Sequence, residues 1–415
     1  MTPETFLRAL FARAVEVADP MQSLAAALPP KPAGRVLVIG AGKASARMAE
    51  AVEAEWGPCE GLVITRYGYA RPCQGIEIVE AAHPVPDAAG EVATKRLLAR
   101  LESVGEGDFV LALISGGGSA LLIAPAGDIT LEEKQSLTQA LLASGAPIGE
   151  INGIRKELSA VKGGRLAAAA YPARMLALMI SDVPGDHPGD IASGPTVGNT
   201  GSAKRALKAL DHWGVVPPAS IKAYLEKGGD PVLPDDPRLS RVENVIYAAP
   251  SQSLAAAADM ARAQGYDAQI LGDAVEGEAR DIAAGHADLA RSAAPGTLIL
   301  SGGELTVTRR GDGIGGPNAE YALALAIALD GAPGIHALAC DTDGVDGAAE
   351  VAGAVIGPDT LAKARAAGID PQSALDRNDA HSFFAAINDQ VVPGPTLTNV
   401  NDFRAIFVGP ETPRD

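Results

Sequence analysis

Short, almost continuously apolar runs, each ending in a loop rich in glycine, serine or aspartate, constrain the fold of this chain most. Four such runs lie in the N-terminal half, at residues 36–39, 61–65, 109–114 and 175–180. A strand that is buried on both faces needs apolar side chains at successive positions, whereas a strand with one wet face alternates. Helix-like stretches separate the runs. This alternation predicts a mainly parallel sheet with helices on both faces.

The length of the chain predicts two domains, because 415 residues exceed what a single hydrophobic core usually serves. The densest break is the proline- and aspartate-rich stretch 231–237. We therefore expect a larger N-terminal Rossmann-like α/β domain over 1–235 and a smaller C-terminal α/β domain over 240–415. Each would have three layers, with a cleft between the domains. It stays open whether one domain borrows a segment from the other. Strands of the second domain are expected at 245–249, 267–271, 297–300 and 336–340.

Charge and cysteine content exclude several classes of function. Lys and Arg number 34 against 51 Asp and Glu, a net charge of −17, so a nucleic-acid backbone would be repelled. The three cysteines fit neither a disulfide framework nor a thiolate zinc site. No leader-like segment opens the sequence, and no apolar run reaches the roughly 18 residues of a membrane span. We expect a cytoplasmic protein with no membrane partner.

Two glycine-rich loops follow predicted strands, at the sheet edge where open parallel sheets bind their ligands. Residues 40–43 read Gly-Ala-Gly-Lys and lead into a helix, and residues 115–119 read Ser-Gly-Gly-Gly-Ser. Backbone N–H groups at such turns, joined by the Lys43 ammonium, would form an anion site. The first loop lacks the spacing of a Walker A motif. A plain strand-to-helix turn with a solvated lysine stays its alternative.

Two further segments in this half carry charge. Lys156, Lys162 and Arg165 cluster on a glycine-interrupted helical stretch, either as contacts to an acidic ligand or as a solvated basic face. Asp182 stands two positions after the run 175–180. A carboxylate placed there serves a metal, a proton or the backbone donors of its own turn.

The C-terminal half repeats the pattern of polar loops after predicted strands. The loops are 301–306 and 340–347, and they carry Glu304, Asp343 and Asp346. Carboxylate oxygens of this kind suit Mg²⁺ held together with phosphates. Asp-Gly turn chemistry is the simpler alternative. Several such loops at strand ends indicate a site for a nucleotide and a metal.

Together these motifs resemble the class II glycerate 2-kinase family, also called the MOFRL family. The matching stretches run in family order over nearly the whole chain: 38–45, 114–119, 152–156, 162–166, 180–186, 191–196, 301–304, 342–347 and 398–402. The resemblance implies two α/β domains with the active site in the cleft between them. It also implies phosphorylation of D-glycerate on its 2-hydroxyl, with ATP and Mg²⁺, giving 2-phosphoglycerate. The lysine thought to be essential in the family falls on Lys43.

One departure from the family pattern concerns an arginine thought to act at the site. The family often reads G-G-R-N-Q-E, whereas this chain has Pro317 between Gly316 and Asn318. Proline cannot supply the charge. Arg309, Arg310 or Arg165 would have to replace it, or the substrate differs.

Under the kinase hypothesis, Lys43 meets charge on the transferring phosphoryl group or on the glycerate carboxylate. Asp182 and Asp343 hold Mg²⁺ or orient the attacking hydroxyl, and which of them binds the metal stays open. D-Glycerate and ATP are the small-molecule partners, and a homodimer is left open. The residues that we expect to bind substrate or nucleotide are Gly40, Gly42, Ser115, Gly116, Gly117, Gly118, Ser119, Lys162, Arg165, Gly303, Glu304, Asn318 and Asp346.

Two other functions stay open. Family members are often labelled hydroxypyruvate reductases, so NAD(P)H-dependent reduction of hydroxypyruvate is the first alternative. That chemistry needs a full dinucleotide fingerprint and an acidic residue about 20 positions later. Here Ser45 takes the third glycine position, and no acid follows the strand that ends near Thr65. The second alternative is a non-catalytic sensor that binds a nucleotide.

Overall fold

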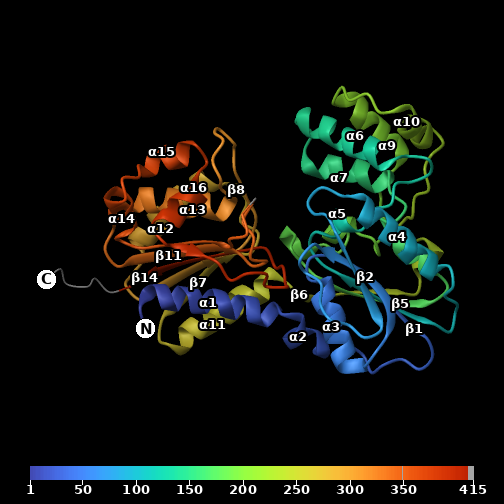
Figure 1. The fold of residues 1–415 in the computed structure, drawn as a ribbon, viewed down its shortest axis with the longest axis horizontal. Helices are drawn as coiled ribbons and strands as arrows, with labels where there is room; N and C mark the ends of the chain where they lie inside the picture. The colour runs from blue at the N-terminus through green and yellow to red at the C-terminus, as the bar shows by residue number, and fades with distance from the viewer. Residues whose placement is uncertain (348, 410–415) are drawn as a thin grey trace. The chain divides into compact units, whose positions relative to one another are not determined.

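The computed structural model describes residues 1–347 and 349–409. The chain forms two compact units. The first, called here the parallel-sheet unit, consists of Leu24–Ile180 and Asp186–Tyr247. The second, the mixed-sheet unit, consists of Met1–Ser23, Ser181–Gly185 and the chain from Ala248 onward. Figure 1 shows the helices and strands of each unit, coloured along the chain.

The parallel-sheet unit is built on a six-stranded sheet with the order β3-β2-β1-β4-β5-β6. β1 pairs in parallel with both β2 and β4, and all six residues of β1 and of β4 are buried. The predicted Rossmann-like parallel sheet is therefore confirmed. The order of strands reverses between β1 and β4, which is where such sheets bind their ligands. The strands are β1 (Val36–Ala41), β2 (Glu60–Arg66), β3 (Ile76–Ala81), β4 (Phe109–Ile114), β5 (Arg174–Ile180) and β6 (Val242–Ala248).

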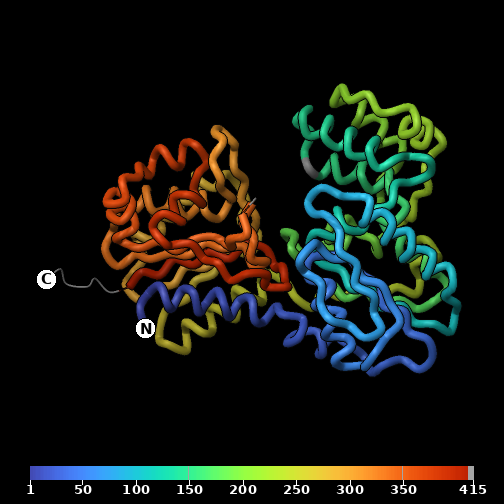
Figure 2. The backbone as a smooth tube through the Cα atoms, in the orientation of Figure 1, coloured from blue at the N-terminus to red at the C-terminus, as the bar shows by residue number. Residues whose placement is uncertain are grey.

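Two groups of helices accompany this sheet. The first contacts its strands or lines their loops: α3 (Ser45–Trp56), α4 (Ala88–Leu101), α5 (Gly118–Leu121) and α8 (Arg165–Ala170). The second group forms a helical cluster with its own apolar core, which Figure 2 shows in green: α6 (Leu131–Ala143), α7 (Ile148–Glu157), α9 (Ala203–His212) and α10 (Ala219–Glu226). Short 3₁₀ turns of this unit are η1 (Leu24–Ala26), η3 (Ile191–Ser193) and η4 (Pro237–Leu239), and η2 (Pro184–Asp186) stands where the chain passes from the mixed-sheet unit back into this one.

The mixed-sheet unit also contains a six-stranded sheet, with the order β13-β12-β11-β14-β9-β7. β7 and β9 run parallel, whereas β14 runs antiparallel to both β9 and β11. The strands are β7 (Asp267–Gly272), β9 (Thr297–Ser301), β11 (Ile335–Asp341), β12 (Gly353–Ile356), β13 (Gln390–Val391) and β14 (Asp402–Val408). A separate parallel pair is formed by β8 (Gly277–Glu278) and β10 (Leu305–Thr306).

Helices cover both faces of the mixed sheet, which confirms the expected three layers (Figure 1). One face carries α1 (Pro3–Ala18) and α11 (Pro250–Ala263), with the short α2 (Pro20–Ser23) after α1. The other face carries α12 (Ala279–Ser292), α13 (Pro317–Leu329), α14 (Thr360–Ala366), α15 (Pro371–Asp376) and α16 (Ala380–Ala386). None of the helices within the described ranges is both long and apolar enough to cross a membrane.

The two units differ from the expected division near residues 235–240. The N-terminal helix α1 packs in the mixed-sheet unit, where Phe6 lies 5.1 Å from Tyr266 and 5.4 Å from Phe407 between ring centroids. Strand β6, expected in the second domain, is instead the edge strand beside β5. The proline-rich stretch 231–237 is thus a connection inside one unit, because prolines mark breaks in regular structure and not the limits of a core.

Candidate active site

The loops after β1 and β4 are joined by hydrogen bonds at the point where the strand order reverses. The Lys43 N–H donates to the Gly116 carbonyl at 2.8 Å. The Ser45 hydroxyl is fully buried, donates to the Leu113 carbonyl at 3.0 Å and lies 3.2 Å from the Ser115 hydroxyl. The serine that breaks the dinucleotide fingerprint therefore ties the β1 loop to the β4 loop.

Two of the expected binding residues, Gly40 and Gly42, are needed for the close approach of these two segments. A Cβ at Gly40 would lie 2.4 Å from the carbonyl oxygen of Leu113, and one at Gly42 would lie 2.1 Å from the Ser115 Oγ. Those distances leave no room for a side chain. Both glycines therefore serve the packing of the first loop against β4 and its loop.

Gly117 brings Lys43 together with a residue that the sequence did not reveal. Gly117 has a left-handed φ of +78°, and a Cβ there would lie 3.1 Å from Lys43 Cγ, 3.1 Å from His83 Cδ2 and 3.2 Å from His83 Nε2. The side chains of Lys43 and His83 thus flank the same point of the β4 loop. The only sequence signal for His83 is a His-Pro-Val-Pro-Asp loop after β3, and the acidic residues of β3 hide that strand.

The C-terminal end of the β4 loop, at Ser119, is held by side chains in the interior of the parallel-sheet unit. The hydroxyl oxygens of Ser119 and Ser193 lie 2.6 Å apart. The Lys162 Nζ is fully buried and donates to the carbonyls of Ser119, at 2.8 Å, and Leu122, at 3.2 Å. Burial holds the pKa of Lys162 well below its ordinary value, and neighbouring cations, Lys134 first, lower it further. Lys162 therefore stabilises the β4 loop from the interior of the unit. Its ammonium bonds to backbone carbonyls and is not exposed at the surface.

Arg165 has a similar interior position. Its side chain is 5% exposed and lies 3.9 Å from the Glu157 carboxylate. It donates to the carbonyls of Asp230 at 2.8 Å, and of Lys156 and Lys162 at 3.0 Å. Arg165 therefore fastens the start of α8 to the surrounding chain, and the structure does not bring it to the β1 and β4 loops.

In the mixed-sheet unit, Asp182 is held by two asparagines. Its carboxylate accepts from Asn399 Nδ2 at 3.0 Å, and its carbonyl accepts from Asn401 Nδ2 at 3.0 Å. The Thr342 hydroxyl in turn donates to the Asn401 carbonyl at 2.7 Å. This chain of bonds links Asp182 to the loop that contains Asp343, so the structure brings these two expected residues into one neighbourhood.

Asp343 itself is fully buried in a turn. Its Oδ1 accepts the Val345 N–H at 2.7 Å, and its own N–H donates to Asp341 Oδ1 at 2.9 Å. These bonds are the turn chemistry that the sequence left as the simpler alternative. Among residues 1–347 and 349–409, no group of three or more His, Cys, Asp or Glu side chains is arranged to hold a metal ion.

Asp346 and Asn318 organise the start of α13. The buried Asp346 carboxylate accepts the backbone N–H of Asn318 at 3.0 Å and of Ala319 at 2.8 Å, and His381 Nε2 lies 3.1 Å from it. A carboxylate at a helix N-terminus satisfies N–H groups that have no partner within the helix. Pro317 suits the first helical position, since its missing N–H is not needed there.

A buried arginine fixes the loop that contains Gly303 and Glu304. The Arg404 side chain on β14 is 1% exposed, donates to the carbonyls of Gly302 and Gly303, the latter at 3.0 Å, and pairs with Asp402 at 3.0 Å. Burial raises the pKa of Asp402, and the Arg404 guanidinium opposes that rise. Sequence reasoning missed Arg404, because one charge in a strand-like run gives no sign of being buried.

The other two arginines considered as replacements are exposed and belong to the same unit. Arg309 donates to the Gly311 carbonyl at 3.1 Å, and the Arg310 N–H donates to Asn378 Oδ1 at 2.7 Å. Both arginines stand in the loop between β10 and α13. Glu304 directly precedes β10. Glu304 is exposed as well.

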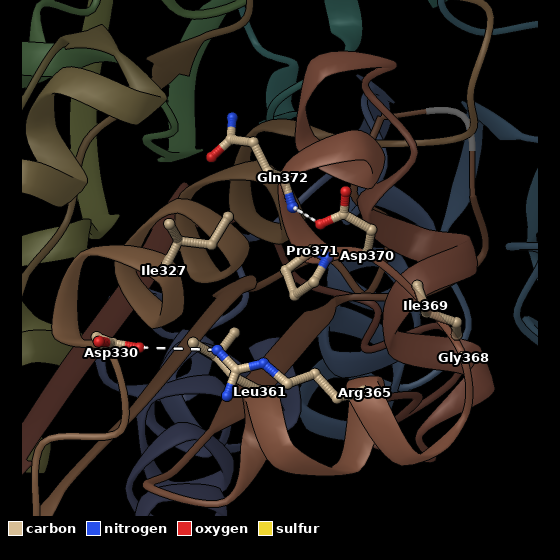
Figure 3. A pocket seen from close by; sticks show the side chains of 9 residues that line it. All are labelled: Ile327, Asp330, Leu361, Arg365, Gly368, Ile369, Asp370, Pro371 and Gln372. Atoms are coloured by element: carbon tan, nitrogen blue, oxygen red, sulfur yellow. Dashed lines mark hydrogen bonds and ion pairs between the residues drawn. The ribbon is translucent and has the colours of Figure 1, made fainter.

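A pocket of about 460 Å³ lies at the other end of α13 (Figure 3). The Arg365 guanidinium reaches Asp330 across it at 3.9 Å. None of the expected site residues lines this pocket. Ile327, which does line it, is roughly 14 Å along α13 from Asn318, at a rise of 1.5 Å per residue. Its lining residues are Ile327, Asp330, Leu361, Arg365, Gly368, Ile369, Asp370, Pro371 and Gln372.

Known proteins resemble this chain over nearly its whole length. Residues 6–226 match the model described as "Domain of unknown function (DUF4147)", and residues 297–402 match that of the MOFRL family. The chain is 49% identical to a protein of Agrobacterium vitis named "Putative hydroxypyruvate reductase", over 97% of this chain and 94% of that protein. It is 38% identical to D-glycerate 2-kinase of Thermotoga maritima, over 94% of each. A crystal structure of glycerate kinase from Thermotoga maritima matches with a TM-score of 0.87 at 35% identity, covering 98% of this chain and 99% of that one.

Proposed function

The chain belongs to the glycerate 2-kinase (MOFRL) family, and on that premise we propose that it transfers the terminal phosphoryl group of ATP to the 2-hydroxyl of D-glycerate. One observation carries the proposal: Lys43 lies against Gly117 of the β4 loop, where the strand order reverses. A cation beside a glycine-rich turn at that point suits the phosphates of a nucleotide. Phosphoryl transfer needs mainly such positioning and neutralisation of charge.

Lys43 is the proposed catalytic lysine. Its backbone N–H is bound to the Gly116 carbonyl and its Cγ lies beside Gly117, so the β4 loop contacts both the backbone and the base of its side chain. Negative charge spreads over the phosphoryl oxygens in the transition state, and an ammonium already in place stabilises that charge without reorganisation. Of the expected cradle residues, Gly116 bonds to the Lys43 N–H and Gly117 lies beside the Lys43 side chain.

The donor chemistry of Asp182 and Asp343 fits Mg²⁺. This ion is commonly held by one or two carboxylates together with substrate phosphates and water, so a cage of three protein ligands is not required. When bound, Mg²⁺ would neutralise charge on the phosphates of ATP. Asn399 fixes the Asp182 carboxylate, while the Asp343 carboxylate is oriented by the Val345 N–H. We propose Asp182 and Asp343 as the residues that hold the metal.

A second candidate is NAD(P)H-dependent reduction of hydroxypyruvate, which the name of the Agrobacterium vitis relative favours. The structure of the β1 loop and of the end of β2 does not favour this reductase function. The Ser45 hydroxyl fills the third glycine position and bonds to β4, and β2 ends at Arg66 with no carboxylate to hold a ribose.

The deciding experiment offers the purified protein ATP, Mg²⁺ and D-glycerate in an ADP-release assay, with the product identified by ³¹P NMR. We expect ADP release that depends on D-glycerate and a product that is 2-phosphoglycerate. The matched reaction contains hydroxypyruvate and NADH or NADPH. Steady oxidation of the cofactor without ADP release would favour the reductase. Binding of ATP with no turnover of either kind would favour a nucleotide sensor.

A further inference from the structure

We propose that His83 contacts the ligand of the site that contains Lys43, and that its imidazole Nε2 donates a hydrogen bond to an anionic oxygen held by that lysine. The ligand chemistry is a phosphoryl or carboxylate oxygen. The inference rests on the proposed function for its kinetic consequences, although binding at His83 can be measured without turnover.

The fold brings His83 back to the point where the strand order reverses. β3 is an edge strand, and β2 and β1 separate it from β4, while His83 follows the last residue of β3, Ala81, by only two positions. Even so, His83 Nε2 and Lys43 Cγ lie within 3.2 Å of the same point, the position that a Cβ on Gly117 would take. A glycine at that place keeps the space between the imidazole and the lysine stem open.

The loop that carries His83 is held by hydrogen bonds on its C-terminal side. Gln135 Nε2 donates to the Pro86 carbonyl at 2.8 Å, and the Tyr67 hydroxyl donates to Asp87 at 2.8 Å. Asp87 also caps α4 by accepting the Gly90 N–H at 3.0 Å. Because the loop is already ordered, little conformational entropy remains to be lost when a ligand binds. Such preorganisation is what a residue that binds a ligand requires.

The chemistry of the pair favours an anion. Lys43 supplies a positive charge, and an imidazole supplies a directional N–H donor beside it. A second donor placed next to an ammonium restricts where a tetrahedral phosphoryl group or a planar carboxylate can sit. Loss of one hydrogen bond to a charged group typically lowers binding or turnover by about tenfold to a hundredfold. His83 should therefore contribute an effect of that size.

The kinetic test compares His83→Gln and His83→Ala with His212→Gln. His212 is exposed at the end of α9, far along the chain from the β4 loop, and serves as the matched control. We expect His83→Ala to lower kcat/KM by about tenfold to a hundredfold, His83→Gln to lose less because its amide can still donate, and His212→Gln to resemble wild type. A rise in KM for ATP places His83 on a phosphate, and a rise in KM for D-glycerate places it on the carboxylate. Folded His83 variants whose kcat and both KM values stay within about twofold of wild type would overturn the proposal.

The binding test uses the wild-type protein and needs no catalysis. The imidazole ¹⁵N signals are recorded while ADP, inorganic phosphate or D-glycerate is added, and His83→Gln identifies the His83 signal. We expect the His83 Nε2 signal to shift with at least one of these ligands, and the His212 signal to stay constant. Turnover of D-glycerate with no shift at His83 would refute the inference alone. A shift at His83 in a protein that turns over no D-glycerate would refute the proposed function and leave the inference standing.

Discussion

Replacing Gly117 by alanine should damage catalysis far more than stability. Gly117 has φ +78°, a left-handed value at which a Cβ costs about 1–2 kcal/mol. The new methyl would also lie 3.1 Å from Lys43 Cγ and 3.1 Å from His83 Cδ2, closer than ordinary van der Waals contact. Both side chains are flexible enough to yield, so the crowding moves them instead of unfolding the loop. A displaced ammonium loses a charge-assisted contact, which lowers kcat/KM by about tenfold to a hundredfold.

Gly145→Ala separates the two effects. Gly145 has nearly the same φ, +79°, but nothing lies within 4 Å of the position that its Cβ would take. Both variants are compared by urea denaturation and by the ADP-release assay. We expect similar losses in free energy of unfolding, about 1–2 kcal/mol each, and a loss of activity only in Gly117→Ala. A Gly117→Ala protein that is destabilised yet fully active would refute the placement of Lys43 against this loop.

Two further predictions concern buried charge in each unit. Burial lowers the pKa of Lys134 from 10.5 to about 7, so the unfolded state binds more protons between these values. The free energy of unfolding of wild type should therefore rise with pH across that window relative to Lys134→Met, and parallel pH profiles of the two proteins in urea denaturation would contradict this. Arg404→Met should cost about 3–5 kcal/mol because it leaves the buried Asp402 carboxylate unpaired. Adding Asp402→Asn should recover part of that loss in the same assay, and an undiminished loss in the double variant would exclude the pair as its cause.

Strands made almost entirely of apolar residues, such as β1 and β4, were predicted from the sequence. β1 and β4 are buried at every position, so their apolar runs were visible without any knowledge of their neighbours. β3 was missed because only its two end residues are buried and two glutamates interrupt it. β14 was missed although it is wholly buried, because Asp402 and Arg404 make it look like a polar stretch. Compensated charge inside a core cannot be distinguished from solvated charge by local pattern alone.

Packing between segments that are distant in the sequence was the other feature that could not be predicted from it. The amphipathic pattern of α1 predicted a helix, but nothing local indicated that Phe6 would pack against Phe407, some four hundred positions later. The candidate site shows the same division. Lys43 and the β4 loop follow adjacent strands, so the topology alone predicted their proximity. Lys162 was expected to face a ligand but bonds to backbone carbonyls inside the unit, since sequence shows which residues are charged and not which way they point.

We propose that phosphoryl transfer to D-glycerate depends on the positive charge of the Lys43 ammonium. The most direct test measures kcat for D-glycerate-dependent ADP release in wild type and in Lys43→Ala, with circular dichroism to confirm that both are folded. We expect the folded variant to lose at least about a hundredfold in kcat, the size expected for removal of one electrostatic contact to the transition state. A folded Lys43→Ala protein that turns over at close to the wild-type rate would contradict it.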